Sequence, residues 1–394
     1  MNILQVTPAF RPAYVYGGPI ESIYQQCSHL AMNGCEVIVL TTNSNGKGKT
    51  LDVINEEEIQ IQKRLRVIYC NKVMLHSVSP SLLRLLKKYI LWSDLVHLRA
   101  VYSFPTIPTL LLCRLFNKPV VWSPHGSLQR WAGSRRPHLK LVWESICRAV
   151  APRKLILHTT CDQEAKESND RFPKAEVATV PHGIAIPAHV RRETRSPLFR
   201  LLYIGLLNPK KGVENLLEAC SILQSEGRMR WSLTIAGAGE TCYTNSIRTK
   251  IRNMGLTLQE GIPGESLNSI HTEASGQVCM VGHVIGDEKE RLFHNADILV
   301  VPSYTENFAI VIAEALSRGV PVIASRGTPW ARLEEMGCGL WIHNDPKSLA
   351  AAIEHMKHSP LLEMGKNGRE WMMKEFNWEF RTQQIITCYR RIVS

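Results

Sequence analysis

The segment 303–318, SYTENFAIVIAEALSR, constrains the fold more than any other part of the chain. It contains two carboxylates, Glu306 and Glu314, with seven residues between them. The short apolar run 298–302 ahead of it predicts a buried strand, and Gly319 followed by a second apolar run predicts a helix end and another strand. The pattern is strand, loop, helix, strand. Its loop falls at the edge where open α/β sheets bind ligands.

The spacing of the two carboxylates suits a long polar ligand. Eight residues of helix rise about 12 Å, close to the reach from the hexose to the ribose of a nucleotide sugar. We expect Glu306 in the loop and Glu314 two turns into the helix, both accepting hydrogen bonds from sugar hydroxyls. The free N–H groups of the first turn, near 308–310, would then face the diphosphate. An arbitrary pair of this spacing is usually one solvated and one salt-bridged Glu, but the strand–loop–helix setting favours a ligand site.

These residues resemble a known family when they are taken with other short segments. E-x7-E within ENF-x5-EA resembles the signature of the retaining glycosyltransferases of glycosyltransferase family 4. Five further matches follow the family order: Gly17-Gly18-Pro19, Pro124-His125-Gly126, Pro209-Lys-Lys-Gly212, Thr328-Pro-Trp330 and Gly337-Cys-Gly339. The last two resemble bacterial surface-polysaccharide members. The ordered set is much more specific than any single segment.

The resemblance implies an α/β fold of the GT-B type. Two Rossmann-like, doubly wound domains would face a cleft, and a C-terminal helix would cross back to the first domain. We expect an acceptor domain at 1–190, a donor domain at 191–370 and the returning helix at 371–394. The chain has 394 residues, enough for two such domains. The segment 183–199 shows no hydrophobic periodicity, and we interpret it as the linker between the two domains.

The resemblance also implies residue roles. Glu306, His125 and Lys211 would be catalytic, with Lys211 on the donor phosphates and His125 near the donor hexose. Donor contacts would come from Gly17, Gly18, Lys210, Lys211, Gly282, Glu306, Asn307, Phe308, Ala309, Ile310, Val311 and Glu314. Two positions depart from the family pattern: Leu206 stands where many members have Arg, and Ala309 replaces the usual Gly.

The resemblance implies that the protein transfers a hexose-type sugar from a nucleotide-diphosphate sugar to a saccharide acceptor, with retention of configuration. We favour a lipid-linked acceptor and a role in the assembly of cell-surface polysaccharide or lipopolysaccharide. A nucleotide-sugar epimerase or hydrolase, transfer to a small soluble acceptor, and a non-enzymatic sugar-nucleotide binder remain alternatives. We expect no cofactor beyond the donor substrate. Because Asp-x-Asp occurs nowhere in the chain, a carboxylate-held Mg²⁺ or Mn²⁺ on the diphosphate is not supported, and we expect no metal site.

The positive charge of the chain is uneven. Residues 1–190 contain 23 Lys and Arg against 13 Asp and Glu, a net of +10, which leaves +2 of the total +12 for the rest. This predicts an anionic surface or substrate at the N-terminal half. Nucleic acid is not expected as a partner, because no RNP-type, zinc-finger or helix-turn-helix pattern is present.

A basic segment follows His125 and suggests where an acceptor could dock. We expect Arg130, Trp131, Arg135 and Arg136 to contact an anionic membrane surface and a lipid-diphosphate-linked saccharide. Pro137 is expected to begin a helix, and we interpret its apolar face as core rather than membrane-inserting. That face comprises Leu139, Val142, Trp143, Ile146 and Val150.

Composition favours the cytoplasm, with peripheral binding to the inner face of the plasma membrane. The eleven cysteines contain no C-x-x-C pair and indicate reduced core residues. No apolar run is long enough for a membrane span, and no signal-peptide pattern is recognised at the beginning of the sequence. The segment 259–275 has no period and is interpreted as an insertion of unassigned role.

Overall fold

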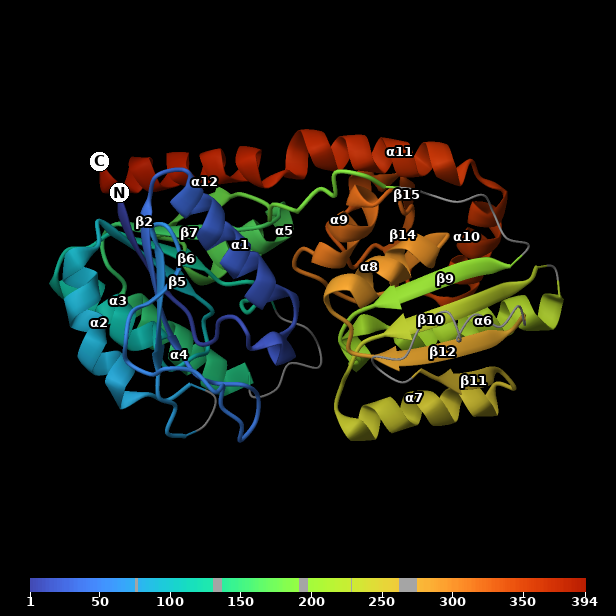
Figure 1. Ribbon diagram of the computed structural model, residues 1–394, viewed down its shortest axis with the longest axis horizontal. Coiled ribbons are helices and arrows are strands. Elements are labelled where there is room, and N and C mark those ends of the chain that lie inside the picture. The colour runs from blue at the N-terminus through green and yellow to red at the C-terminus, as the bar shows by residue number, and fades with distance from the viewer. Residues whose placement is uncertain (75–76, 130–136, 191–197, 228, 262–274) are drawn as a thin grey trace. The chain divides into compact units, whose positions relative to one another are not determined.

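The computed structural model describes residues 1–394 except 75–76, 130–136, 191–197, 228 and 262–274 (Figure 1). The chain forms two compact units. The first consists of Met1–Gly183 with Trp378–Ser394, and the second of Ile184–Asn377. Each unit is an open α/β sheet with its own apolar core, so the expected pair of Rossmann-like domains is confirmed.

The first unit contains an eight-stranded sheet in the order β3-β4-β2-β1-β5-β6-β7-β8. All neighbours are parallel except β3 and β4. Continuous apolar runs such as Val37–Leu40 explain the parallel core, because such strands are buried on both faces. The strands are β1 (Asn2–Val6), β2 (Glu36–Thr42), β3 (Ile59–Gln62), β4 (Leu65–Cys70), β5 (Leu95–Arg99), β6 (Val120–Ser123), β7 (Leu155–Thr159) and β8 (Glu176–Thr179).

The helices of the first unit include the end of the chain. They are α1 (Gly18–Met32), α2 (Pro80–Trp92), α3 (Thr106–Leu115), α4 (Pro137–Val150), α5 (Asp162–Arg171) and α12 (Trp378–Val393). The ring of Trp378 stacks on His29 at 5.3 Å, and Gln383 Nε2 donates to Asn33 Oδ1 at 2.9 Å, so α12 packs along α1. The apolar face of α12 joins the core beneath the sheet. The expected return of the C-terminal helix is therefore confirmed.

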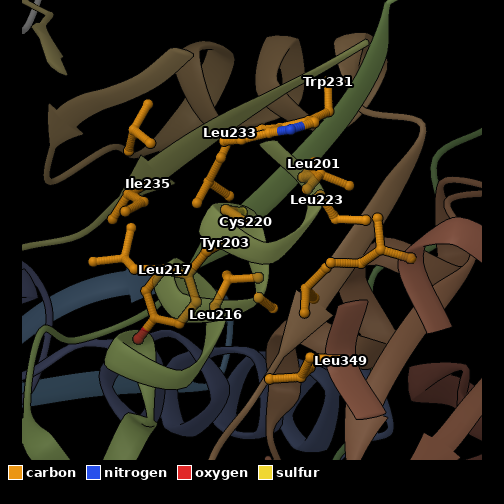
Figure 2. Packing of buried hydrophobic residues seen from close by; sticks show 14 of the residues in the cluster. Leu201, Tyr203, Leu216, Leu217, Cys220, Leu223, Trp231, Leu233, Ile235 and Leu349 are labelled. Atoms are coloured by element: carbon orange, nitrogen blue, oxygen red, sulfur yellow. The ribbon is translucent and has the colours of Figure 1, made fainter. Parts of the chain in front are cut away.

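The second unit contains a seven-stranded parallel sheet in the order β11-β12-β10-β9-β13-β14-β15. The strands are β9 (Phe199–Ile204), β10 (Trp231–Ala236), β11 (Thr257–Glu260), β12 (Gln277–Gly282), β13 (Ile298–Val301), β14 (Val322–Ser325) and β15 (Gly339–Ile342). The helices are α6 (Val213–Glu226), α7 (Thr241–Asn253), α8 (Gly286–Asn295), α9 (Ile310–Ser317), α10 (Pro346–His358) and α11 (Leu361–Trp371), and a π-helical turn (Met372–Phe376) follows α11. Figure 2 shows α6 packing Leu216, Leu217 and Cys220 against the β9 and β10 side chains.

Strand order reverses once in each sheet, between β1 and β5 and between β9 and β13. Loops after two neighbouring strands diverge at such a point and leave a crevice at the carboxyl ends, where doubly wound folds bind ligands. In the second unit the two loops concerned are 205–212 and 302–309. They contain Lys211 and Glu306, so the fold brings together two residues 95 positions apart.

Two expectations from the sequence need correction. Gln259 and Glu260 are not part of an irregular insertion, because they pair with β12 as the end of β11; residues 262–274 lie outside the described part. The apolar face of α4 is core only in part: Trp143 and Val150 pack against the core, but Leu139 and Val142 are 61% and 59% exposed, and Ile146 is 42% exposed. The apolar arc of this helix is wider than the surface it packs against, and only its Trp143 side faces the core.

Within the described residues, no helix combines the length and apolar character that a bilayer span would require.

Candidate functional site

The centre of the candidate site is an ion pair between Lys211 and Glu306. Lys211 Nζ lies 2.5 Å from Glu306 Oε1, and the side chains are 25% and 11% exposed. Ser303 Oγ donates to the same carboxylate oxygen at 2.7 Å. A lysine held this way presents a positive charge that a phosphate can compete for, because a charge-assisted contact can be exchanged for another of the same kind.

Three hydrogen bonds from backbone and amide groups fix the backbone of the Glu306 loop. Tyr304 N donates to Lys210 O at 2.9 Å, which ties this loop to the one after β9. Glu306 N donates to Gly327 O at 2.8 Å, which ties it to the loop after β14. Asn344 Nδ2 donates to Pro302 O at 2.6 Å. The carboxylate therefore sits on a loop whose backbone is fixed by its neighbours on three sides.

Gly212 allows the two loops to approach each other closely. Its φ is +65°, and a Cβ there would stand 2.0 Å from Pro302 O. No side chain fits in that space, and the left-handed conformation favours glycine as well. Asn208 accepts a hydrogen bond from Lys210 N at 3.0 Å and begins the short 3₁₀ turn Pro209–Lys211 that leads into Gly212.

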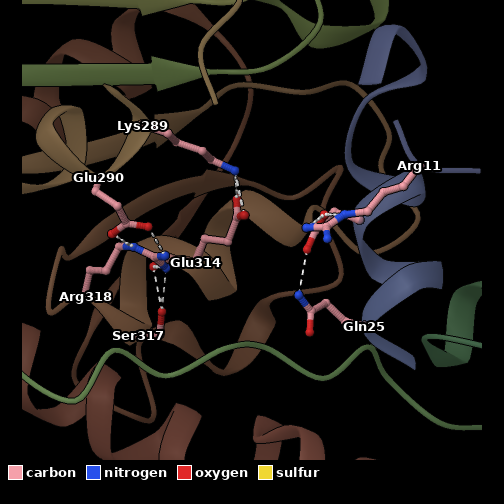
Figure 3. Close-up of polar contacts among 8 residues, drawn as sticks. Arg11, Gln25, Lys289, Glu290, Glu314, Ser317 and Arg318 are labelled. Atoms are coloured by element: carbon pink, nitrogen blue, oxygen red, sulfur yellow. Dashed lines mark hydrogen bonds and ion pairs between the residues drawn. The ribbon is translucent and has the colours of Figure 1, made fainter. Parts of the chain in front are cut away.

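Glu314 is held by a second lysine that sequence reasoning missed. Lys289 Nζ on α8 lies 2.6 Å from both Glu314 oxygens (Figure 3). Next to it, Arg318 pairs with Glu290, which ties the end of α9 to α8. Both carboxylates of the E-x7-E pair are therefore neutralised by lysines from other parts of the second unit. No short-range sequence signal marks Lys289, because it reaches Glu314 only through the packing of α8.

The helix between the two glutamates begins later than the simple spacing estimate assumes. It begins at Ile310, so only four residue steps to Glu314 are helical, a rise of about 6 Å rather than about 12 Å. Ala309 precedes the helix with φ +59° and forms no side-chain cap. Trp330 is buried and donates from Nε1 to Phe308 O, and its ring packs on Phe308 at 5.3 Å. This contact anchors the loop immediately before the helix.

The remaining expected donor residues are distributed between the two units. Lys210 is next to Lys211, Asn307 lies in the Glu306 loop, and Ile310 and Val311 form the first turn of α9. Gly282 ends β12, and its carbonyl accepts from Gly237 N at 2.6 Å. Gly17 and Gly18 begin α1 in the first unit, and their share in donor binding stays a prediction. Leu206, where an Arg was expected, is 56% exposed.

His125 lies in the first unit, in the turn that follows β6. Its backbone has φ +50°, a conformation rare for residues other than glycine and common at functional sites. Gly126 N donates to Glu164 Oε1 at 2.7 Å and fixes the turn. His125 Nε2 lies 3.3 Å from Arg99 Nη1, and its ring stacks on His182 at 5.7 Å. Sequence reasoning missed Arg99, which looks like an ordinary strand end.

The expected acceptor and membrane residues Arg130, Trp131, Arg135 and Arg136 lie outside the described residues. Helix α4, which follows them, and the adjoining α3 expose six large apolar side chains: Leu111, Leu115, Leu139, Leu141, Val142 and Ile146.

Two family profiles match the chain in succession. The profile of Glycosyltransferase Family 4 matches residues 16–186, and that of Glycosyl transferases group 1 matches residues 189–371. Together they cover almost all of both units.

Individual relatives are distant. O-antigen chain mannosyltransferase B from Escherichia coli is 28% identical over 48% of this chain and 45% of its own length, so the chain spans less than half of that relative. GDP-mannose:cellobiosyl-diphosphopolyprenol alpha-mannosyltransferase from Xanthomonas campestris is 23% identical over 89% of this chain and 86% of its own length. The Anabaena HepE structure with UDP-glucose superposes with a TM-score of 0.72 and 16% identity, covering 99% of this chain and 100% of that one. This structural likeness concerns the fold.

The close passage of the two loops predicts a stability difference between glycines at the two ends of α6. Gly212 and Gly227 have nearly the same φ, +65° and +63°, but a Cβ at Gly227 meets no atom within 4 Å. Gly227→Ala should cost roughly 1–2 kcal/mol for the left-handed conformation alone. Gly212→Ala should cost roughly 1–3 kcal/mol more, because Pro302 must move. Equal denaturation midpoints for the two variants would contradict the described loop contact.

Proposed function

Because the chain belongs to glycosyltransferase family 4 and has the GT-B fold, we propose that it transfers a hexose-type sugar from a nucleotide-diphosphate sugar to a saccharide acceptor, with retention of configuration. The acceptor is proposed to be lipid-diphosphate-linked, and the product to enter cell-surface polysaccharide. The observation on which the proposal depends is the Lys211–Glu306 pair at the strand-order reversal of the second unit.

Lys211 is proposed to bind the donor diphosphate. Its ammonium group is restrained by Glu306 and by the 3₁₀ turn before Gly212, so it is positioned before the ligand arrives. A restrained cation loses little entropy on binding and can stabilise the charge that develops on a leaving phosphate. The N–H groups at the uncapped start of α9 would add partial positive charge near the same anion.

The proposed reaction follows the chemistry of the retaining family. The bond between the sugar C1 and the phosphate oxygen breaks, and the acceptor oxygen bonds to C1 on the same face. The acceptor proton passes to the departing phosphate oxygen. The protein's part is to position both substrates and to stabilise the diphosphate charge.

Glu306 and Glu314 are proposed to bind hydroxyls of the hexose and the ribose. Both carboxylate oxygens of Glu314 bind Lys289. A ribose hydroxyl must therefore either bind Glu314 while the lysine stays in place or displace the lysine. Leu206 supplies no charge, which leaves Lys211 and the neighbouring Lys210 as the cations of the loop after β9. We propose that the reaction needs no metal, because the chain contains no Asp-x-Asp.

The first unit is proposed to bind the acceptor and to dock on an anionic membrane at the cytoplasmic face. The exposed apolar side chains of α4 support this, because an amphipathic helix with an uncovered apolar face suits a lipid surface. Lys140 and Arg148 lie on α4, and Arg114 on α3 donates to Ala149 O at the end of α4. The relative from Xanthomonas acts, by its name, on a diphosphopolyprenol-linked saccharide, a ligand of the same character.

Transfer itself is tested by mass analysis. The purified protein is incubated with a panel of nucleotide sugars, with and without bacterial lipid extract, in buffer containing EDTA. We expect a glycosylated lipid and free nucleoside diphosphate only when the extract is present, and we expect Glu306→Ala to abolish both while the variant remains folded. Conversion of a nucleotide sugar without any acceptor would instead favour the epimerase or hydrolase alternative.

Lys211→Ala should weaken binding of a nucleoside diphosphate far more than binding of the nucleoside. A hydrogen bond to a charged group contributes about 1.5–3 kcal/mol, a loss of roughly 10- to 150-fold in affinity by calorimetry. Lys250→Ala is the control, since Lys250 pairs with Glu218 on α6 in the same unit. If the nucleoside lost as much affinity as its diphosphate, the phosphate role of Lys211 would be wrong.

Membrane docking is tested by vesicle flotation. The wild type should float with anionic vesicles at low salt and less at high salt, because basic residues contribute about 1 kcal/mol each near such a surface. Changing Leu139, Val142 and Ile146 together to Ser should reduce flotation at least roughly tenfold.

The matched control for flotation is Leu362→Ser, since Leu362 is 60% exposed on α11 in the other unit. A second variant changes Arg130, Arg135 and Arg136 to Glu and should also float less. If the wild type never floats with anionic vesicles, a soluble acceptor becomes the better proposal.

A further inference from the structure

Arg99 is an arginine at the carboxyl end of β5 that is only 1% exposed and has all five N–H groups directed at uncharged atoms. The acceptors are Gln5 Oε1, Ser123 Oγ, His125 Nε2 and Gln26 Oε1, and the remaining N–H group points at His97 Nδ1 from 3.5 Å. Among the described residues, the acidic groups near it are Tyr389 and Cys27. Burial raises the pKa of both, so both are neutral, and neither is a carboxylate. Since arginine keeps its proton in proteins, the first unit holds a buried cation surrounded by neutral acceptors.

The hydrogen bonds of the histidines around Arg99 are consistent with one arrangement of their protons. Val180 O can only accept, so His158 Nε2 donates to it at 2.9 Å, and the other nitrogen of this neutral ring accepts from Ser123 Oγ at 2.7 Å. Because the Ser123 proton is used there, His97 Nε2 must donate to Ser123 at 2.7 Å. His97 Nδ1 then accepts from the hydroxyl of Tyr389 on α12.

Among the described residues, the hydrogen bond that joins His125 to the same network comes from Arg99. Arginine cannot accept a hydrogen bond, so His125 Nε2 is the acceptor in the 3.3 Å contact with Arg99 Nη1. In a neutral ring the proton must then be on Nδ1. Within the described part of the chain, no hydrogen bond uses that Nδ1–H group. The imidazole ring of His125 stacks on that of His182, with 5.7 Å between the ring centroids.

We propose that Arg99 is a positioning residue that fixes His125 as the neutral tautomer with its proton on Nδ1. In this state His125 cannot serve as a general base through Nε2, because the guanidinium occupies that lone pair. It can donate Nδ1–H to an oxygen of a bound ligand. The tautomer follows from the geometry of the first unit; the donation to a ligand rests on the proposed function.

Burial and the charge of Arg99 also favour the neutral form of His125. Burial and then the Arg99 charge hold the pKa of His125 well below its ordinary value, and burial lowers the pKa of His182 to about 3 and that of His158 to about 4. The titratable groups that face His125 and its Arg99 partner come from five elements: His97 and Arg99 on β5, His158 on β7, His182 after β8, Cys27 on α1 and Tyr389 on α12. The carboxylate of Glu164 on α5 bonds instead to the backbone of Gly126 and Thr160.

Nitrogen NMR of histidine-labelled protein tests the tautomer directly. His125→Gln identifies the His125 signals by their disappearance. In the wild type, Nε2 should have the shift of an unprotonated nitrogen and Nδ1 that of a protonated one, unchanged between about pH 5 and 8. A protonated Nε2, or an imidazolium forming in this range, would overturn the proposal.

Arg99→Gln separates the role of Arg99 from simple burial. Without the cation, the pKa of His125 should rise, because burial remains but the Arg99 charge no longer lowers it, and the tautomer should no longer be fixed. Arg66→Gln is the control, because Arg66 is an arginine of the same unit whose partner is Glu58. If His125 keeps the same single tautomer in Arg99→Gln, Arg99 does not position it.

The ligand step has its own readout. The side-chain nitrogen of Asn is as many bonds from the backbone as histidine Nδ1. His125→Asn should therefore keep roughly tenfold more turnover than His125→Ala in the transfer assay, since one neutral hydrogen bond is at stake. Equal rates would refute the donation while leaving the tautomer result standing, and absence of transfer in the wild type would refute the proposed function alone.

Discussion

The candidate site depends on one close passage of backbone, where Gly212 lies against the carbonyl of Pro302. Strand order reverses between β9 and β13, so the loops after these strands start side by side. Without a side chain at Gly212 they can touch, and Lys211 then reaches Glu306. Neither residue could hold the other if the loops were a side chain's width further apart. The ion pair thus results from the sheet topology. The distance between Lys211 and Glu306 along the sequence does not indicate that the two side chains are close in space.

Much of the fold could be predicted, because buried parallel strands and amphipathic helices leave periodic patterns. The strands from Asn2 onward and the helix after Glu306 follow from such patterns. The pairing of Lys211 with Glu306 is not predicted, because it depends on the strand order of the sheet. The partners of Glu314 and His125 could not be predicted in this way. Lys289 and Arg99 reach them across helix and strand packing, which single-sequence periodicity does not encode.

The exposed face of α4 shows where pattern reasoning fails for a physical reason. A helical hydrophobic arc reports how much apolar surface a helix has, and it says nothing of how much surface its neighbours offer. Trp143 and Cys147 face the core of the first unit, and Leu139 and Val142 on the same arc remain in solvent. Such a surplus costs solubility unless another apolar phase covers it, which is why we connect it with a lipid surface rather than with folding.

The two units treat buried charge in opposite ways. In the second unit each candidate carboxylate faces a lysine within 2.6 Å, so the site is close to neutral before a ligand arrives. A diphosphate entering there can take over the lysines while sugar hydroxyls take over the carboxylates, and each exchange replaces one charge-assisted contact by another. In the first unit Arg99 faces only neutral acceptors, so its charge is not cancelled by the groups around it. That charge acts on the proton positions of the histidines. We therefore propose that the second unit exchanges ions with a charged ligand and that the first holds a neutral hydrogen-bond donor in one fixed state.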